Sequence, residues 1–319
     1  MSTVLITGGA GFIGSNLADA LVADGRLVHI VDDLSNGRKV NIPDGATLHV
    51  MDVRAGAELA ALVTSLRPDT IFHLAAQTDV RKAVEAPGFD ADVNIIGTLN
   101  VLEAARAVGA RVLFSSTGGA AYGEYDGLPV PSPETAETRP LSHYGMSKMA
   151  GEGYMRLYQR LYGIDTLVLR LANVYGPRQD PHGEAGVVAI YCGLLLEGRS
   201  PRVFGDGRQT RDYVYVGDVV EAFLAAERGE PGTTANVGTG REVSVLQLLD
   251  ALGYEGEPEY VAARLGEVQR SALDPSLAHL LWGWRARTPL VEGLTATRES
   301  VAAARRGGAA RPHLATAQG

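Results

Sequence analysis

The strongest constraint on the fold is a regular alternation of short apolar runs and helix-like segments through the first half of the 319-residue chain. Short continuous apolar runs are typical of strands buried on both faces, and intervening helices make such strands parallel. We therefore predict an α/β fold with a doubly wound parallel sheet and right-handed crossovers. The expected strands are Val4–Thr7, Leu27–Val31, Leu48–Met51, Thr70–Leu74, Arg111–Phe114 and Leu167–Leu171.

The pattern loosens after Gly176, which suggests a second, smaller unit. We expect residues 1–175 to form the sheet domain, with some later segments returning to it. Residues 176–300 are expected to form a smaller C-terminal lobe that binds substrate. Residues 301–319 are rich in Ala, Gly and Arg and have little to bury, so we predict a disordered or frayed tail.

Composition excludes several classes of protein. Hydrophobic residues make up 45% of the chain, too many for a disordered protein, and no apolar run approaches the ~20 residues of a membrane span. A single Cys allows no internal disulfide, and no Cys/His cluster offers a metal site. The formal net charge of −8 argues against a nucleic-acid partner. With no targeting segment visible after Met1, we expect a cytoplasmic protein.

Three glycines follow the first expected strand directly and open a helix: Gly8, Gly11 and Gly14. In a dinucleotide-binding (Rossmann-type) loop the first allows a tight turn and the second lets a pyrophosphate approach backbone N–H groups. The third lets helix and strand pack closely. Because Gly is common here, with 39 residues, an ordinary turn between strand and helix is the alternative. The position between strand and helix favours the dinucleotide loop.

The next expected strand ends at Asp32, where a carboxylate accepts hydrogen bonds from the adenosine ribose and repels a 2′-phosphate. This predicts NAD rather than NADP, although the neighbouring cations Arg38 and Lys39 weaken that preference. Asp52 follows the third strand, and either an adenine contact or a helix N-cap accounts for it equally well.

Tyr144 and Lys148 are four residues apart and so share one helix face. An ammonium beside a phenol favours the phenolate, which makes Tyr144 a candidate base. Only three of the 29 basic residues are Lys, so the position of Lys148 calls for an explanation of its own. The alternative is that Tyr144 and Lys148 are a pair on a helix surface. A site is favoured by the hydroxyl-rich segment Ser115–Thr117, which lies at the carboxyl end of an expected strand, where ligands of open parallel sheets bind.

At this point the chain resembles an extended short-chain dehydrogenase/reductase, and within that superfamily the UDP-hexose 4-epimerase group. The resemblance covers roughly residues 3–300. The segments that carry it are TGGAGFIG (7–14), VDDLSNG (31–37), HLAAQTDV (73–80), NIIGTLNVLEAA (94–105), STGGAAYGE (116–124), YGMSK (144–148), RLANVYGPRQ (170–179), GDGRQTRDYVYVGDVV (205–220) and NVGTG (236–240).

The resemblance implies an enzyme that inverts C4 of a UDP-hexose, of the UDP-glucose/UDP-galactose type, through a transient 4-keto sugar and a bound NAD. Tyr144 would take the proton of the sugar 4-hydroxyl, and Lys148 would contact the nicotinamide ribose. Thr117 would relay the proton, with Ser116 as second choice, although Gly118 occupies the commoner hydroxyl position of the family. A turn hydroxyl at the strand end is the alternative for Thr117.

It also implies the residues that surround both ligands. The cofactor would contact Gly8, Gly11, Phe12, Ile13, Asp32, Asn36, Asp52, Val53, Leu74, Ala75, Ala76, Gln77, Tyr144 and Lys148. The UDP-sugar would contact Thr78, Thr117, Gly118, Gly119, Asn173, Arg178, Val188, Arg211, Arg270 and Asp274. Four of these have alternatives: Arg178 as a solvated loop residue, which we favour, Val188 as a core residue, and Arg211 and Arg270 as residues of surface ion pairs. Asn94 is expected either to hydrogen-bond near the catalytic strand or to cap a helix.

The sugar itself remains open. A 4,6-dehydratase of this family carries Asp-Glu after the catalytic Thr, and Gly118-Gly119 here disfavours dehydration. Two small residues leave room for a C6 carboxylate, which keeps UDP-glucuronate possible, and Ser271 is small enough to admit an N-acetyl group at C2. A reductase with exchangeable cofactor and a non-catalytic NAD-binding regulator are further alternatives. By analogy with the family we expect a homodimer formed through helix 94–108 and the Tyr144 helix.

Overall fold

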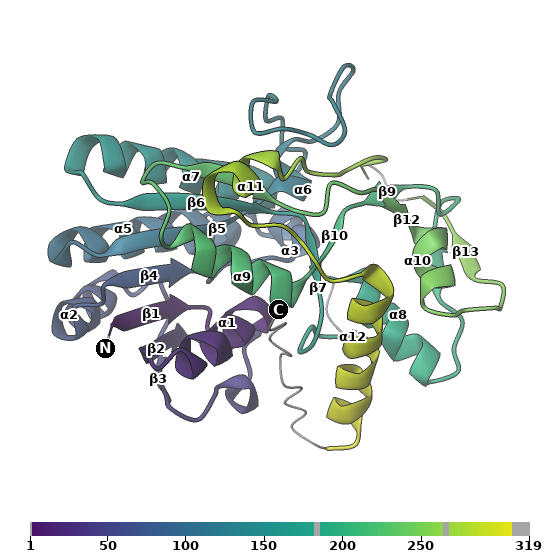
Figure 1. The fold of residues 1–319 in the computed structure, drawn as a ribbon, viewed down its shortest axis with the longest axis horizontal. Helices are drawn as coiled ribbons and strands as arrows, with labels where there is room; N and C mark the ends of the chain where they lie inside the picture. The colour runs from purple at the N-terminus through teal and green to yellow at the C-terminus, as the bar shows by residue number, and fades with distance from the viewer. Residues whose placement is uncertain (1, 182–185, 264–267, 308–319) are drawn as a thin grey trace.

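The computed structural model describes residues 2–181, 186–263 and 268–307. Its centre is a parallel seven-stranded sheet with the strand order β11-β6-β5-β4-β1-β2-β3 (Figure 1). The predicted doubly wound parallel sheet is confirmed. The strands are β1 (Thr3–Thr7), β2 (Leu27–Asp32), β3 (Ala46–Val50), β4 (Thr70–His73), β5 (Arg111–Thr117), β6 (Thr166–Leu171) and β11 (Thr234–Val237).

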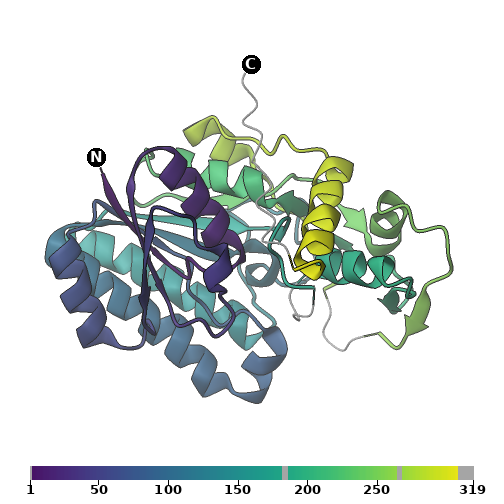
Figure 2. The ribbon, with the colours of Figure 1, turned by 90° about the horizontal axis from the view of Figure 1, so that it is seen from below.

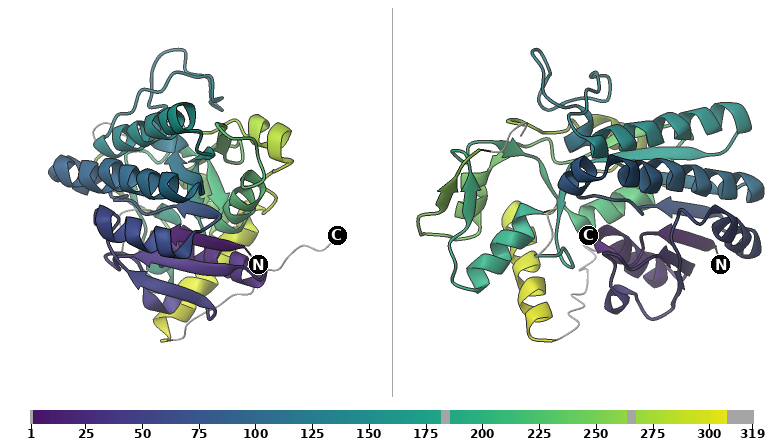
Figure 3. Two further views of the ribbon diagram at one scale, coloured as in Figure 1. Left: turned by 90° about the vertical axis from the view of Figure 1, so that its left-hand side faces the viewer. Right: turned by 180° about the vertical axis from the view of Figure 1, so that it is seen from behind.

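Helices cover both faces of this sheet because successive side chains of each strand point to opposite sides. Val4 and Ile6 of β1 pack on α1 (Phe12–Ala23) and α9 (Val216–Ala226), whereas Leu5 faces the opposite core. That second core is closed by α2 (Gly56–Leu66), α5 (Gly97–Val108) and α7 (His143–Tyr162). The left view of Figure 3 shows these three helices on one side of the sheet.

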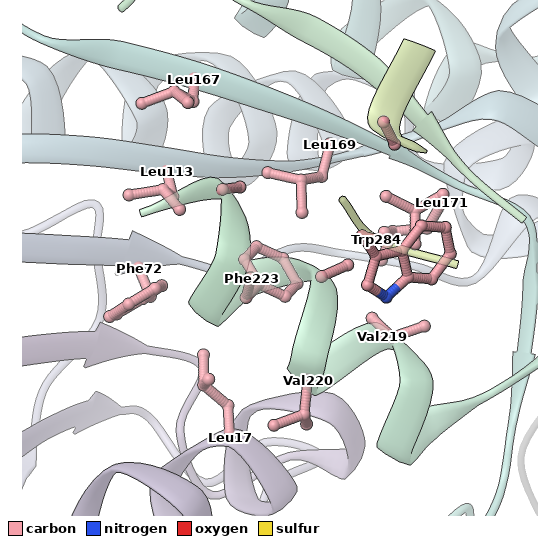
Figure 4. Packing of buried hydrophobic residues seen from close by; sticks show 14 of the residues in the cluster. Leu17, Phe72, Leu113, Leu167, Leu169, Leu171, Val219, Val220, Phe223 and Trp284 are labelled. Carbon is pink, nitrogen blue, oxygen red and sulfur yellow. The ribbon is translucent and has the colours of Figure 1, made fainter. Parts of the chain in front are cut away.

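The core on the α1 side brings late parts of the chain back to the sheet. Phe223 of α9 meets Phe72 of β4 edge-on, with ring centroids 6.2 Å apart (Figure 4). Trp284 is buried in the same cluster and its indole N–H donates to the carbonyl of Asp218 at 2.8 Å. Replacing Phe223 by Ala would leave a cavity and cost about 3–5 kcal/mol.

Short elements connect the strands at their carboxyl ends. The turn η1 (Lys39–Asn41) follows β2, and α3 (Val80–Glu85) and α4 (Pro87–Ala91) follow β4. A π-helical turn, η2 (Asp92–Ile96), then leads directly into α5, so the expected helix 94–108 contains a local widening. The short helix α6 (Gly118–Ala121) follows β5, and the segment between α6 and α7 is the loop at the top of Figure 1.

The remaining elements form a smaller lobe beside the sheet (Figure 2). Its core includes Tyr175, Val188, Tyr191, Leu248 and Leu294. The lobe elements are β7 (Asn173–Tyr175), α8 (Val187–Leu196), β8 (Arg202–Phe204), β9 (Thr210–Arg211), β10 (Tyr213–Tyr215), β12 (Val243–Ser244), α10 (Val245–Ala251), β13 (Glu259–Val261) and α12 (Leu290–Arg305). Helix α11 (Ser276–Trp282) is the exception, because it packs on α9 and β11, with Ala278 buried in the core on the α1 side of the sheet. The strands of the lobe pair as β7 with β10, β9 with β12 and β8 with β13.

The structure differs from the expected boundaries in two places. The tail predicted over 301–319 is wrong at its start, because α12 continues to Arg305 and packs on α8, with Val301 buried. Residues 308–319 of that tail lie outside the described residues. The sheet also has a strand beyond the six expected, β11, which lies beside β6. Within the described residues, no helix has the length and apolar character needed to cross a membrane.

Candidate active site

A cleft of about 1700 Å³ runs along the carboxyl ends of the strands and into the smaller lobe. Its walls include the glycine loop after β1, the ends of β2, β4 and β5, the first turns of α7, and residues of β7, α8 and β9. Ligands of open parallel sheets bind at this edge. Twenty-one of the twenty-four predicted site residues line it, and Gly118, Arg270 and Asp274 do not. The residues that line it are Gly8, Gly11, Phe12, Ile13, Asp32, Asn36, Asp52, Val53, Leu74, Ala75, Ala76, Gln77, Thr78, Thr117, Gly119, Tyr144, Lys148, Asn173, Arg178, Val188 and Arg211.

The glycine loop forms one end of the cleft. Gly8 has a φ of +73°, and a Cβ atom there would lie 2.7 Å from the backbone nitrogen of Ala75. A Cβ atom at Gly14 would lie 2.2 Å from the carbonyl oxygen of Gly8, so both positions require glycine. Helix α1 begins next to Gly11 with no side-chain cap and no acidic residue in its first turn. Its free N–H groups therefore face the cleft and suit a pyrophosphate.

Asp32 lies at the end of β2 with its carboxylate fixed by two backbone donors. The N–H groups of Ala10 and Leu34 each donate to it at 2.9 Å. Burial raises the pKa of Asp32, and these two hydrogen bonds oppose that rise. The remaining lone pairs of the carboxylate are available to ribose hydroxyls.

Asp52 does not cap a helix, because the N-cap of α2 is Ala55. Its carboxylate instead accepts from the side chain of Arg54, and that ion pair lowers the pKa of Asp52. Sequence reasoning missed the neighbouring Phe89, whose ring lies between the guanidinium of Arg54 (5.1 Å) and the ammonium of Lys82 (4.6 Å). Phe89 and Lys82 line the cleft, and no sequence signal marked either residue.

Asn94 holds the segment that follows β4. Its side-chain oxygen accepts from the backbone N–H of Gln77 at 2.9 Å, and its amide donates to the carbonyl of Gln77 and to Ser147. Asn94 lies within the π-helical turn rather than at a helix end, so it is not a cap. It therefore connects the Leu74–Thr78 wall of the cleft to α7.

Tyr144 and Lys148 both reach the cleft from the first turns of α7. The ammonium of Lys148 donates to the carbonyl of Ser115 at 2.8 Å, and burial lowers its pKa to about 8. The expectation that Lys148 favours the phenolate of Tyr144 stays a prediction for the ligand-bound site, and other groups of the chain act against it. Burial raises the pKa of Tyr144 well above its usual range, and the carboxylate of Asp90 acts in the same direction.

The two candidate hydroxyls at the end of β5 have different environments. Ser116 is buried and donates to the carboxylate of Glu152 at 2.6 Å. The Thr117 hydroxyl accepts from the N–H of Ala120 at 3.2 Å, which caps α6, and its side chain is partly exposed in the cleft. The O–H of Thr117 is therefore available to donate to a ligand, whereas the O–H of Ser116 donates to Glu152.

The lobe side of the cleft carries Asn173, Val188 and Arg211. Asn173 is exposed, and Val188 is at once part of the lobe core and of the cleft wall. Arg178 is not a solvated loop residue: its side chain is 8% exposed and pairs with Asp19 of α1. It also has a left-handed backbone, with φ of 71°.

Three predicted substrate residues lie away from the cleft. Gly118 faces the side chain of Leu273, and Arg270 is exposed and pairs with Glu242 at 2.6 Å. Asp274 accepts from the N–H and hydroxyl of Ser276 at the start of α11. Neighbouring residues 264–267 lie outside the described residues.

Comparison with protein families settles the relationship that this geometry suggests. A model of the NAD dependent epimerase/dehydratase family matches residues 4–238. The chain belongs to this family. The resemblance noted in the sequence is thereby confirmed, and NAD is the cofactor of the family.

Relatives within the family match nearly the whole chain. A UDP-glucose 4-epimerase of Mycolicibacterium smegmatis is 46% identical over 92% of this chain and 97% of its own. The structure of a Thermotoga maritima UDP-glucose 4-epimerase with UDP-glucose has a TM-score of 0.92 at 43% identity, covering 95% of this chain and 99% of that one. A Thermus thermophilus UDP-glucose 4-epimerase with NAD has a TM-score of 0.89 at 40% identity, with the same coverage.

The residues present fit the cofactor of this epimerase/dehydratase family. The crowded positions of Gly8 and Gly14 give the tight turn and the close packing of helix on strand that a dinucleotide loop requires. The uncapped start of α1 supplies N–H donors, and Asp32 supplies acceptors at the adjoining strand end.

Proposed function

We propose that this chain is a UDP-hexose 4-epimerase that interconverts UDP-glucose and UDP-galactose through a transient 4-keto sugar. One observation carries the proposal: Thr117, Tyr144 and Lys148 line the same cleft as the dinucleotide loop. The whole-chain similarity to UDP-glucose 4-epimerases supports it. The glycine loop after β1 and Asp32 would hold NAD, which would supply the hydride acceptor and donor for C4 of the sugar.

The roles of the chain's own groups follow from their positions. Tyr144 takes the proton of the sugar 4-hydroxyl and returns it after the keto sugar has turned in the cleft. Its raised pKa makes it a weak base on its own, so it needs cationic charge beside it when substrate is bound. Thr117 donates its O–H to the sugar 4-oxygen. The ammonium of Lys148, which donates to the carbonyl of Ser115, supplies a positive charge beside this site.

The UDP group is assigned to the lobe. Arg211 lines the cleft and pairs with phosphate oxygens through its guanidinium. Arg270 reaches the diphosphate only if it leaves Glu242, and Asp274 reaches the uridine ribose only if it leaves Ser276. Because Arg211 lines the cleft and the other two do not, we rank it first among the three as a UDP contact.

A UDP-hexose with a larger C6 or C2 group is the second candidate substrate. Gly119 lies opposite Asn173, and a Cβ atom at Gly119 would come 3.4 Å from the Asn173 amide oxygen. The missing side chain leaves this space open to substrate. UDP-glucuronate and UDP-N-acetylglucosamine are the two sugars that test it.

We also propose a homodimer formed through α5 and α7. Leu161 and Tyr162 near the end of α7 are about half exposed, and Met146 near its start is 58% exposed. Apolar side chains on the outer side of a helix are typical of an interface between subunits. Sedimentation velocity of the purified protein tests this state.

The function is tested by supplying the purified protein with UDP-glucose, UDP-glucuronate and UDP-N-acetylglucosamine separately and following the sugars by NMR. We expect UDP-galactose from UDP-glucose, and NAD released on denaturing the protein. Conversion of none of the three would contradict the proposal. Conversion only of UDP-glucuronate or UDP-N-acetylglucosamine would replace its substrate by the second candidate.

A further inference from the structure

A carboxylate with no solvent exposure lies directly behind the candidate catalytic groups. Glu152 is on α7, one turn beyond Lys148, and its side chain is completely buried. It accepts from the Ser116 hydroxyl at 2.6 Å and from two guanidinium nitrogens of Arg170, at 2.9 and 2.7 Å. One side chain thus joins α7, β5 and β6.

The guanidinium of Arg170 continues this network away from the cleft. It donates to the hydroxyl of Tyr122 at 2.9 Å, and that hydroxyl donates to the amide oxygen of Asn236 at 2.9 Å. The Asn236 amide donates in turn to the carbonyl of Ser132. Each member is buried and has its partners, so the network is rigid.

An ion pair of this kind is a poor way to gain stability alone. Removing two charges from water is costly, and apolar side chains of the same volume often stabilise a core as well or better. Two of the three elements that Glu152 joins carry the candidate catalytic groups: β5 carries Thr117, and α7 carries Tyr144 and Lys148. Its position therefore points to a role in arranging these groups.

We propose that Glu152 is a positioning residue for the epimerase reaction. Its carboxylate fixes the end of β5, and with it Thr117, relative to Tyr144 on α7, and it holds a negative charge beside the Lys148 ammonium. The kinetic part of this proposal rests on the proposed function. Glu152 does not line the cleft, so it acts through the groups that it positions.

The titratable groups around Lys148 come from three elements. Asp90 of α4 and Glu152 of α7 both raise the pKa of Lys148, against the larger lowering by burial. His73 of β4 is neutral, since burial and the charge of Lys148 lower its pKa to about 3. The phenol of Tyr144 is uncharged at neutral pH. Loss of the Glu152 charge would leave Arg170 unbalanced, which also lowers the pKa of Lys148.

Kinetics of two variants test the positioning role. Glu152→Gln keeps the shape of the side chain and removes its charge, and Ser116→Ala removes the link to β5 with little change in volume. We expect kcat to fall roughly 10- to 100-fold for both, measured per folded, NAD-loaded protein, with KM within about threefold. Arg156→Gln is the matched control, because Arg156 meets the same carboxylate from the surface at 3.5 Å and is 53% exposed.

The pH dependence separates positioning from charge. In Glu152→Gln the fall of kcat at alkaline pH should move to lower pH, since Lys148 loses its proton more easily. In Ser116→Ala and in Glu152→Asp, which keep the carboxylate, that fall should stay in place while kcat drops. A merely structural residue would lower the amount of folded protein and leave both kcat per folded molecule and the pH profile unchanged, which would overturn the proposal.

Lysine NMR gives a readout that needs no sugar. The chain has only Lys39, Lys82 and Lys148, so side-chain labelled lysine gives three signals, assigned with Lys148→Met. We expect Lys148 to titrate at about pH 8 in the parent protein and lower in Glu152→Gln. An unshifted titration would refute the inference even in an active epimerase. A shifted titration in a protein without epimerase activity would instead count against the proposed function and keep the electrostatic part.

Discussion

Leu273 packs against Gly118 so closely that a Cβ atom at Gly118 would lie 2.4 Å from its Cδ1 atom. Leu273 is buried, and its backbone N–H donates to the carboxylate of Asp212 at 3.2 Å. This contact fixes the segment before α11 onto the turn that follows Thr117. Gly118 is therefore required for packing between distant parts of the chain, whereas Gly119 faces the cleft.

The two glycines should respond differently to the same substitution. Gly118→Ala collides with Leu273, so we expect a loss of about 1–3 kcal/mol in the free energy of unfolding, measured with urea. Gly119→Ala makes only a close contact with Asn173 and should keep the parent stability while raising KM for the sugar nucleotide. Equal stability of the two variants would contradict this division.

Arg211 should contribute to substrate binding and not to cofactor binding. Arg211→Ala removes a guanidinium from the cleft wall, and we expect KM for UDP-glucose to rise roughly tenfold, with bound NAD unchanged. Arg208→Ala is the control, because Arg208 is nearby but 84% exposed and pairs with Asp206. An Arg211→Ala protein with the parent KM would remove Arg211 from the UDP site.

His73 should make the fold sensitive to acid. It is 1% exposed between the hydroxyls of Thr7 and Thr98, and its pKa is lowered from 6.5 to about 3. Between these values the unfolded chain binds a proton that the fold does not, so stability decreases as the pH falls below 6.5. This amounts to roughly 2 kcal/mol at pH 5.

Urea unfolding at pH 7 and pH 5 measures that loss. His73→Asn should be less stable than the parent at pH 7 but should lose about 2 kcal/mol less between the two pH values. His279→Gln, at an exposed position, should keep the parent dependence. If His73→Asn and the parent lose the same stability, His73 is not the source of the acid sensitivity.

The sequence predicted those parts of the fold and the site that are marked by residues close together in the chain. The apolar runs of β1, β2 and β6 are continuous, and the glycine loop and the Tyr144–Lys148 spacing need only neighbouring residues. Strand β11 was missed because its Asn236 is polar, and the partners of its buried amide are distant in the sequence: the nitrogen donates to the carbonyls of Ser132 and Asp274, and the oxygen accepts from Tyr122.

Features that depend on distant residues could not be predicted. The last turns of α12 are stabilised by packing on α8, which the Ala-rich sequence does not reveal. The raised pKa of Tyr144 depends on burial and on Asp90, which the fold brings from α4. The role of Gly118 likewise depends on Leu273.

The most direct test of the central claim uses UDP-glucose deuterated at C4, with no NAD added to the purified protein. We predict UDP-galactose that retains the deuterium at C4, detected by NMR and mass spectrometry, and no turnover by Tyr144→Phe carrying the same amount of bound NAD. Product that has lost the label to solvent, or a Tyr144→Phe variant with the parent rate, would contradict the account.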